Sequence, residues 1–428
     1  AHARVVPALA GLRNRWHCPI PCASAQSTCM TSTDPEAQSI RRLIAMFALT
    51  GFATSLIIRV TDPLVAVIAE DLTTSVGTVA LLASSFALPF ALIQPLLGPV
   101  GDALGKRRVI LVCQVLLTLL VAAAAMAPDF TTLLIFRALA GAAAGGTMPL
   151  TLAVFGDEVP LARRQVAIGR FLVFTIIGGV AGGALAAVVE PLFGWRGVLW
   201  ICAGFSAMAS CVLLWSQLRA PPAPTQSFQP VMALQRYVGL FRLPAARVLY
   251  AAVAIEGGLV FGAFPHFAPL LAARGLGGTT EAGLSLAAFG CGGFIYAAIV
   301  AQVLRLMGQR NMVRLGGFLA GAALLGMAFA WTAHIFIGCA LLLGTGFFMI
   351  HNTIQVRASE ISPTARASGL AMHSFSFFMG QTAGPAMMGV ALALLGSTLA
   401  FIWVAMALLA LGWWLSVTGP GTSQEHRR

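Results

Sequence analysis

The chain has 428 residues, of which 58% are hydrophobic and 9% charged, and its mean hydropathy is +0.88. A water-soluble globule cannot bury that much apolar surface, so the composition excludes a soluble protein and indicates a chain surrounded by lipid. The formal net charge of +12 would suggest a nucleic-acid partner in a soluble protein. Here we assign the cations to membrane topology and expect no nucleic-acid binding.

Residues 1–42 form a predicted cytoplasmic N-terminal tail. The part before about Ser39 contains arginines and prolines and no long apolar stretch, so we expect it to be disordered and not a signal peptide. The segment Thr31 to Arg42 resembles a short cytoplasmic lead-in. The residues before Met30 are either native sequence or the result of an early start assignment.

Twelve apolar runs follow, each long enough at about 1.5 Å per residue to cross a hydrocarbon core of about 30 Å. We expect the first six spans at Leu43–Leu64, Val76–Leu97, Val109–Ala127, Leu133–Phe155, Val166–Val189 and Val198–Leu218. We expect the second six at Val248–Leu271, Ala282–Leu304, Val313–Trp331, Ile335–Val356, Ala367–Leu394 and Ser397–Val417. The predicted fold class is an all-α membrane protein.

The spans divide into two sets of six. Residues 43–218 form the predicted N-terminal bundle and residues 248–417 the C-terminal bundle. Between them, residues 219–247 are rich in proline and arginine and form a predicted cytoplasmic linker. Residues 418–428 form a predicted cytoplasmic tail.

Charged residues inside spans are costly in lipid and are therefore the first functional candidates. Arg59 and Asp62 lie three positions apart in the first span and share a face. Because this span enters from the cytoplasm, we expect both residues in its outer third. Arg137 lies at a similar depth in the fourth span, so the three side chains can form one buried charge cluster.

A short charged stretch, Gly98–Arg108, joins the second and third spans, and we expect a tight loop here. Its glycines, its single acid and its basic residues stand at the spacing of a known signature between two helices: Gly98, Asp102, Gly105, Lys106 and Arg107. On these residues the chain resembles the major facilitator superfamily. The resemblance implies twelve helices in two pseudo-symmetric six-helix bundles and secondary transport by alternating access.

The resemblance also implies a cytoplasmic gate. In it Asp102 docks on the start of the eleventh span, where Ser362 and Pro363 resemble helix-capping residues. Lys106 or Arg107 then pairs with an acid at the end of the fourth span: Asp157 or Glu158. These contacts would hold the cytoplasmic side closed.

Arg137 and Gly141 resemble a fourth-helix motif that proton-coupled exporters of the superfamily use in handling protons. The alternative is that Arg59, Asp62 and Arg137 form a structural ion pair without a role in transport. The sequence alone does not separate these two interpretations.

Glycines in the fifth and eleventh spans predict close helix packing and bending. The predicted hinge residues are Gly178, Gly182, Gly183, Gly380, Gly384 and Pro385. The fifth-span pattern resembles the antiporter signature of the superfamily, but Phe174 and Gly179 depart from it. That departure weakens antiport relative to symport.

Glu256 lies near the middle of the seventh span with no cation within one turn in sequence. A carboxyl group in such a place favours its neutral form, which suits a reversible proton carrier. His351 in the tenth span is a second candidate for proton or substrate binding. For each, the alternative is a structural hydrogen bond between helices.

The two sets of spans repeat each other. Four residues of the first set recur 202 positions later: Glu158, Arg164, Gly178 and Gly182 recur as Glu360, Arg366, Gly380 and Gly384. The charged stretch has a partial copy in which Gly308 and Arg310 correspond to Gly105 and Arg107. Parallel repeats of this kind imply two bundles that face each other across a central cavity.

The cations indicate the orientation. Of 26 Lys and Arg residues, 22 lie in the tails or in connections on the side of the tails, and the others are Arg59, Arg137, Arg196 and Arg274. This asymmetry predicts cytoplasmic termini. The preference for Arg over Lys and the abundant Ala and Gly suggest a GC-rich bacterial genome, and hence the bacterial inner membrane.

We therefore predict a secondary active transporter that exports a small organic compound in exchange for protons. Proton-coupled uptake of a small metabolite is the alternative, and a non-transporting receptor or scaffold of the same fold is the alternative from another class. Motifs for catalysis, metal binding and nucleotide binding are missing, so we expect no enzyme activity, metal or cofactor. The expected partners are a small-molecule substrate, protons and the lipid bilayer, and we expect a monomer.

Overall fold

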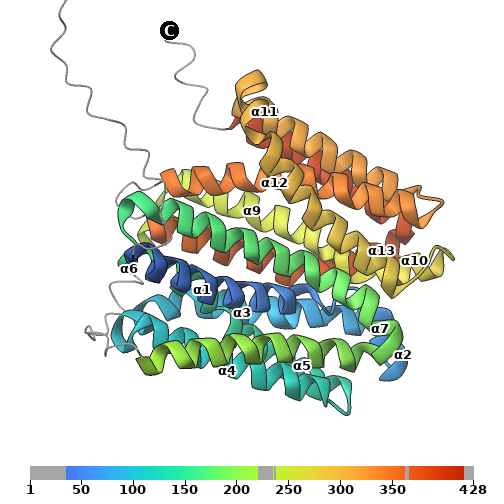
Figure 1. The fold of residues 1–428 in the computed structure, drawn as a ribbon. Helices are drawn as coiled ribbons and strands as arrows, with labels where there is room; N and C mark the ends of the chain where they lie inside the picture. The colour runs from blue at the N-terminus through green and yellow to red at the C-terminus, as the bar shows by residue number, and fades with distance from the viewer. Residues whose placement is uncertain (1–34, 220–234, 236–237, 362–365, 419–428) are drawn as a thin grey trace, which may run out of the picture.

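The structure, a computed structural model, describes residues 35–219, 235, 238–361 and 366–418, and nearly all of these are α-helical. Most of the predicted N-terminal tail, most of the linker and the residues from 419 onward lie outside the described residues. The helices run roughly side by side. Those of the first half occupy the lower part of Figure 1 and those of the second half the upper part.

The chain forms two series of helices. The first is α1 (Pro35–Arg59), α2 (Val65–Asp71), α3 (Val76–Leu104), α4 (Lys106–Ala125), α5 (Phe130–Ala144), α6 (Thr147–Glu158) and α7 (Leu161–Arg219). The second is α9 (Pro244–Ala263), the short 3₁₀ helix η1 (Phe264–His266), α10 (Phe267–Ala273), α11 (Thr279–Ala328), α12 (Ala333–Glu360) and α13 (Arg366–Val417). The predicted all-α class is confirmed.

Nine helical segments among the described residues are long and apolar enough to cross a membrane. Three of them are 53, 50 and 49 residues long, which exceeds twice the length that a core of about 30 Å requires. Each is interrupted at one glycine, Gly194, Gly308 or Gly396, whose φ is 64°, 72° or 75°. The chain turns back there, so the two arms correspond to two predicted spans (Figure 1). The exact count of twelve stays a prediction.

Prolines interrupt two predicted spans. The first span was expected as one helix to Leu64, but α1 ends at Arg59 and α2 follows a turn. Pro63 has no N–H to donate to the Arg59 carbonyl, and proline disfavours a helical conformation at the residue before it. The N–H of Asp62 donates to the Arg59 carbonyl instead, at 3.1 Å. Pro265 lies at the corresponding interruption between α9 and α10.

The charged stretch Gly98–Arg108 is not the loop that the sequence suggested. Helix α3 continues through Leu104 and α4 begins at Lys106, so the reversal takes place at Gly105 alone. Its φ of 92° and ψ of 117° lie in a region that favours glycine. The length of the loop was overestimated because charged residues at the end of a span can extend past the lipid and remain helical.

Close glycine contacts pack the repeated helices in the same way in both halves. A Cβ atom at Gly178 or Gly182 would overlap the backbone carbonyl of Phe52 or Leu56 in α1. The counterparts Gly380 and Gly384 meet α9 at Ala254 and Gly258. Because Phe52 and Ala254, like Leu56 and Gly258, are also 202 positions apart, the repeat extends to the contacts.

Among the described residues, the buried hydrophobic side chains form two clusters in the first half, between residues 40 and 213, and three in the second half, between residues 240 and 415. Contacts between the halves gather toward the end that carries α2 and α10, called here the α2/α10 end. There Ser84 Oγ donates to the Thr382 carbonyl at 2.6 Å, and Thr280 Oγ1 to the Ala187 carbonyl at 3.3 Å. The rings of Phe90 and Phe378 lie 4.2 Å apart.

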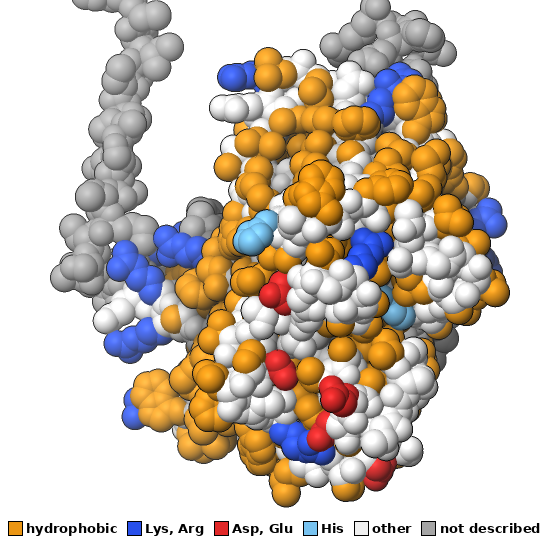
Figure 2. All heavy atoms as spheres, turned by 90° about the vertical axis from the view of Figure 1, so that its right-hand side faces the viewer, with side chains coloured by type: hydrophobic (Ala, Val, Ile, Leu, Met, Phe, Trp, Pro, Cys, Tyr) orange, Lys and Arg blue, Asp and Glu red, His pale blue; other side chains and the backbone are white. Residues whose placement is uncertain are grey.

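The α2/α10 end faces the viewer in Figure 2, where acidic side chains gather on its lower part. Asp71 joins the end of α2 to the bend after Gly194, since its Oδ2 accepts from Trp195 Nε1 at 3.0 Å and from Arg196 Nη1 at 2.5 Å. These hydrogen bonds lower the pKa of Asp71 from its usual value. The contact ties the connection after the first span to the connection after the fifth.

The glycine packing generates a test with an adjacent control. We expect Gly178→Ala to lower the melting temperature of the purified protein, because overpacking typically costs about 1–3 kcal/mol. Gly179→Ala should leave it unchanged or slightly raised, since nothing lies within 4 Å of a Cβ atom at Gly179 and alanine favours the helix. Equal melting temperatures for the two variants would contradict the packing account.

Candidate functional site

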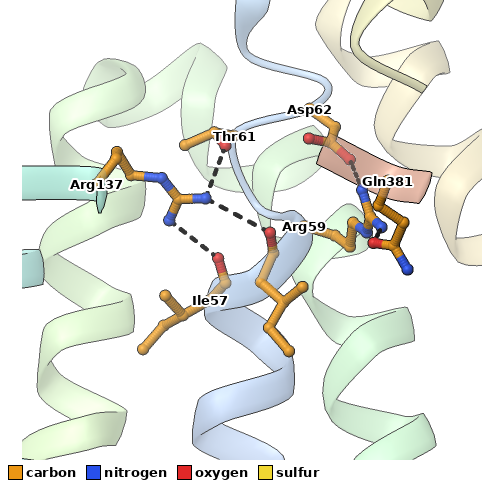
Figure 3. Close-up of polar contacts among 7 residues, drawn as sticks. Ile57, Arg59, Thr61, Asp62, Arg137 and Gln381 are labelled. Carbon is orange, nitrogen blue, oxygen red and sulfur yellow. Dashed lines mark hydrogen bonds and ion pairs between the residues drawn. The ribbon is translucent and has the colours of Figure 1, made fainter. Parts of the chain in front are cut away.

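Arg137 forms hydrogen bonds with the end of α1 and with the turn that interrupts the first predicted span. Because α1 ends at Arg59, the carbonyls of its last turn lack the helical partners that a continuing helix would supply. Arg137 in α5 donates through Nη1 to the Ile57 carbonyl at 3.2 Å and through Nη2 to the Ile58 carbonyl at 3.5 Å. It also donates to Thr61 Oγ1 at 3.2 Å (Figure 3). The guanidinium therefore caps a helix C-terminus, where a cation is stabilised.

Arg137 is almost fully buried, and its guanidinium lies 4.4 Å from the centre of the Phe86 ring. Gly141, one turn further along α5, lies so close to the Phe86 carbonyl that a Cβ atom would not fit there. The residues of the predicted fourth-helix motif thus have a structural explanation. The arginine holds the end of α1, and the glycine lets α5 approach α3.

The predicted cluster of Arg59, Asp62 and Arg137 does form around the turn after α1. Arg59 Nη1 lies 3.3 Å from Asp62 Oδ2. Asp62 is 1% exposed, and among the described residues its other oxygen, Oδ1, has no hydrogen-bond partner. Arg137 bonds the carbonyls of the turn and acts on Asp62 through its charge, not through an ion pair (Figure 3).

Arg59 also reaches the second half of the protein. Its Nη2 donates to Gln381 Oε1 in α13 (Figure 3). Its guanidinium carbon lies 4.2 Å from the centre of the Phe261 ring in α9 and 5.9 Å from that of Phe264. The sequence analysis did not select Gln381 as a site residue. Nothing in the pattern of either span indicated that it would meet Arg59.

A second cluster of titratable groups lies inside the second half. His351 Nδ1 of α12 lies 3.0 Å from Glu256 Oε2 of α9, and Glu256 is fully buried. The His373 ring of α13 lies 5.0 Å from the His351 ring. Within the described part of the chain, Glu256 Oε1 and both His373 ring nitrogens have no hydrogen-bond partner. The cluster thus offers several free positions for a proton.

Phenylalanines join the two clusters. Phe377 of α13 lies 4.5 Å from the His351 ring and 5.4 Å from the Phe261 ring, on which Arg59 rests. The side chains of Arg59 and His351 are each 14% exposed although they lie inside the helix bundle. Both clusters therefore border one aromatic region of the second half.

In the first half, the position equivalent to Glu256 belongs to a hydrogen-bond network of uncharged side chains. Thr54, which precedes Glu256 by 202 positions, donates to Gln114 Oε1 at 3.3 Å, and Gln114 Nε2 donates to Ser206 Oγ at 2.8 Å. Sequence reasoning missed these residues. Threonine, glutamine and serine are common in spans, and only the repeat offset indicates Thr54.

The predicted gate residues are partly described. Lys106 Nζ lies 2.6 Å from Asp157 Oδ2, and Arg107 Nε donates to Glu158 Oε1 at 2.7 Å. Both pairs link α4 to α6 within the first half, so they do not by themselves join the two halves. Residues 362–365, the predicted docking partner of Asp102, lie outside the described residues, as does the side chain of Asp102. Gly98 lies within α3.

The remaining predicted hinge residues pack at other interfaces. Gly183 faces Gly283 of α11, where a Cβ atom would lie 2.7 Å from the Gly283 carbonyl oxygen, so this contact crosses between the halves. The Pro385 carbonyl lies 3.1 Å from His266 Nε2. The hinge role of these residues stays a prediction.

Comparison with known proteins identifies the family. The family described as Major Facilitator Superfamily matches residues 47–385. The inner membrane transport protein YnfM of Escherichia coli is 26% identical over 183 residues, which cover 42% of this chain and 43% of that protein. The MFS-type transporter YwfA of Bacillus subtilis is 24% identical over 364 residues, covering 84% and 87% of the two chains. The chain thus spans less than half of YnfM, and other matches span as little as 20% of the relative.

A solved structure shares the fold. The nucleoside transporter NupG superposes with a TM-score of 0.68 at 15% identity, covering 88% of this chain and 98% of NupG. At that identity the likeness concerns the fold alone. The family match over most of the chain, the apolar helices and the shared fold lead to one conclusion: the chain belongs to the major facilitator superfamily and is a multi-pass membrane protein.

Proposed function

We propose that the protein is a secondary active transporter that exports a small organic compound in exchange for protons. The observation that carries the proposal is the Glu256–His351 pair, a carboxyl and an imidazole 3.0 Å apart inside the second half. Buried ionisable groups are costly in a membrane and are retained mainly for function. A proton can bind either partner of this hydrogen bond, and the free Glu256 Oε1 offers a further position.

In this proposal, residues 43–218 and 248–417 move as two bodies. Within each half, glycine contacts bring the backbones of repeated helices together, as between α1 and α7. Between the halves, the contacts of Arg59 with Gln381 and Phe261 are single side-chain interactions. Separation at the α2/α10 end would break these contacts and the Gly183–Gly283 contact between α7 and α11, and would leave the helix pairs within each half intact. This is the pattern that alternating access requires.

The cytoplasmic gate is part of the same proposal. Asp102, Lys106 and Arg107, with Asp157 and Glu158, would stabilise the state closed to the cytoplasm. Because the observed ion pairs join α4 to α6, we propose that they hold the turn at Gly105 in place. Asp102 would make the contact between halves. The membrane is the bacterial inner membrane in this proposal, with both termini cytoplasmic and the protein acting as a monomer.

Glu256→Gln tests the coupling. Replacement removes the proton site but keeps the side-chain shape, so we expect proton-driven accumulation in proteoliposomes to be lost. Exchange of labelled for unlabelled substrate should remain, and its dependence on pH should be removed. The measurement compares both modes between about pH 6 and 8.

Glu190→Gln is the matched control, because Glu190 is a partly exposed acid at the α2/α10 end of α7. It should transport as the parent protein does. Unchanged proton-driven accumulation in Glu256→Gln would remove Glu256 from the coupling mechanism.

Arg107→Glu tests the gate. Charge reversal places two acids together, so we expect slower transport, and the double variant Arg107→Glu/Glu158→Arg should recover most of the rate. An exposed ion pair contributes only about 0–1 kcal/mol, so the melting temperature should change little. A double variant as slow as the single variant would contradict the pairing as the cause.

The direction of transport separates export from the alternative, uptake of a metabolite with protons. Labelled substrate should be added outside right-side-out and inverted vesicles with an imposed proton gradient, and its accumulation inside should be measured. Exchange for protons predicts accumulation when the vesicle interior is acidic, and inverted vesicles then reproduce the direction of export. Accumulation in right-side-out vesicles with an acidic exterior would favour uptake.

A further inference from the structure

We propose that the transported compound is an aromatic or similarly hydrophobic carboxylate, and that Arg59 binds its carboxylate group. The inference rests on the proposed transport function and names the substrate class of that site. Three observations carry it: the location of Arg59, the balance of buried charge around it, and the identity of its present hydrogen-bond partner.

Arg59 lies at the pseudo-symmetry axis between the halves. The repeat offset of 202 relates Arg59 to Phe261, and the guanidinium of the first lies 4.2 Å from the ring of the second. A residue that contacts its own symmetry mate must lie close to the axis that relates the two copies. In transporters built from repeats, this interface between the copies is where substrate binds.

The charge around Arg59 is not balanced within the described residues. Two guanidiniums, of Arg59 and Arg137, face one carboxylate, of Asp62. The Glu256–His351 pair adds no net charge while it holds one proton. One positive charge therefore remains, and an anionic substrate would compensate it, whereas a cation would be repelled.

Gln381 occupies the place that a carboxylate would take. The guanidinium presents several donors in a plane, and its Nη2 donates to the neutral amide oxygen of Gln381. The Asp62 contact, at 3.3 Å, is longer than the 2.7–2.9 Å typical of charge-assisted hydrogen bonds. A substrate carboxylate would replace a neutral acceptor by a charged one, and arginine–carboxylate pairs are the stronger kind.

The surrounding wall is aromatic. Phe261 makes edge-to-face contacts with four other phenylalanine rings, with centroids 4.9–5.7 Å apart: Phe264, Phe289, Phe347 and Phe377. A ring or a branched apolar group fits such a wall better than a sugar or a small hydrophilic acid does. The site thus joins one cationic group to an apolar surface, which matches an acid with a hydrophobic body.

Binding to the purified full-length protein in detergent tests the inference directly. Isothermal titration would compare benzoate and phenylacetate with benzamide, acetate and benzylamine. We expect benzoate or phenylacetate to bind roughly tenfold more tightly than benzamide, since a hydrogen bond to a charged group contributes more than a neutral one. Acetate should bind more weakly, because it lacks the ring, and benzylamine should not bind.

Two variants of Gln381 make the test specific. Gln381→Glu supplies a carboxylate from the protein itself, so we expect at least roughly tenfold weaker benzoate binding. Gln381→Leu removes the competing acceptor and should bind benzoate as well as the parent protein or better. Arg242→Gln is the control for loss of an arginine, because Arg242 is exposed and distant in the chain from the site. Melting temperatures close to that of the parent protein would confirm folding.

Equal binding of benzoate and benzamide, preference for benzylamine, or no binding of any tested carboxylate would overturn the inference. So would a Gln381→Glu variant that binds benzoate as the parent protein does. Selective carboxylate binding without proton-driven transport would overturn the coupling proposal alone. Proton-driven export of a neutral compound without carboxylate binding would overturn the substrate class alone.

Discussion

The carbonyl groups at the end of α1 need hydrogen-bond donors inside a bundle that lipid surrounds. Pro63 ends the helix there, and lipid supplies no donors for the Ile57 and Ile58 carbonyls. Arg137 supplies them from α5. The same turn places Asp62 beside Arg59, so the geometry of the charged site follows from how this helix end is satisfied.

This arrangement explains why a structural and a functional role need not exclude each other. Arg137 is held by backbone groups and by Thr61, so its guanidinium has little freedom to move. Its charge nevertheless acts on Asp62 and sets the electrostatic environment of Arg59. Arg59 is held by single contacts, three of which come from the other half, and is the member of the cluster that relative motion of the halves would release.

The two halves repeat the same helix packing but carry different chemistry at equivalent positions. The first half has Arg59 where the second has Phe261, and it has Thr54 where the second has Glu256. Backbone contacts through glycine tolerate little variation, because a Cβ atom would overlap a carbonyl on the facing helix. Side chains that face the region between the halves are free of that constraint. A cationic site in one half and a protonatable pair in the other can therefore have diverged on one scaffold.

The sequence by itself determined that the chain lies in lipid, that it is helical and that its two halves repeat each other. The apolar composition indicates the lipid environment. The length of each apolar run indicates a helix that spans the membrane, and the spacing of the glycines indicates where helices pack closely. It also indicated Arg59, Asp62, Arg137 and Glu256, because charge inside an apolar run is visible without a structure.

Only the tertiary structure decided which partner each of these residues has. Arg59 meets Gln381 across 322 positions, and Glu256 meets His351 across 95. The single-residue reversal at Gly105 was likewise decided in three dimensions. Hydropathy reports how apolar a run is, whereas the direction of each side chain and the phase of each helix depend on packing against helices that are distant in sequence.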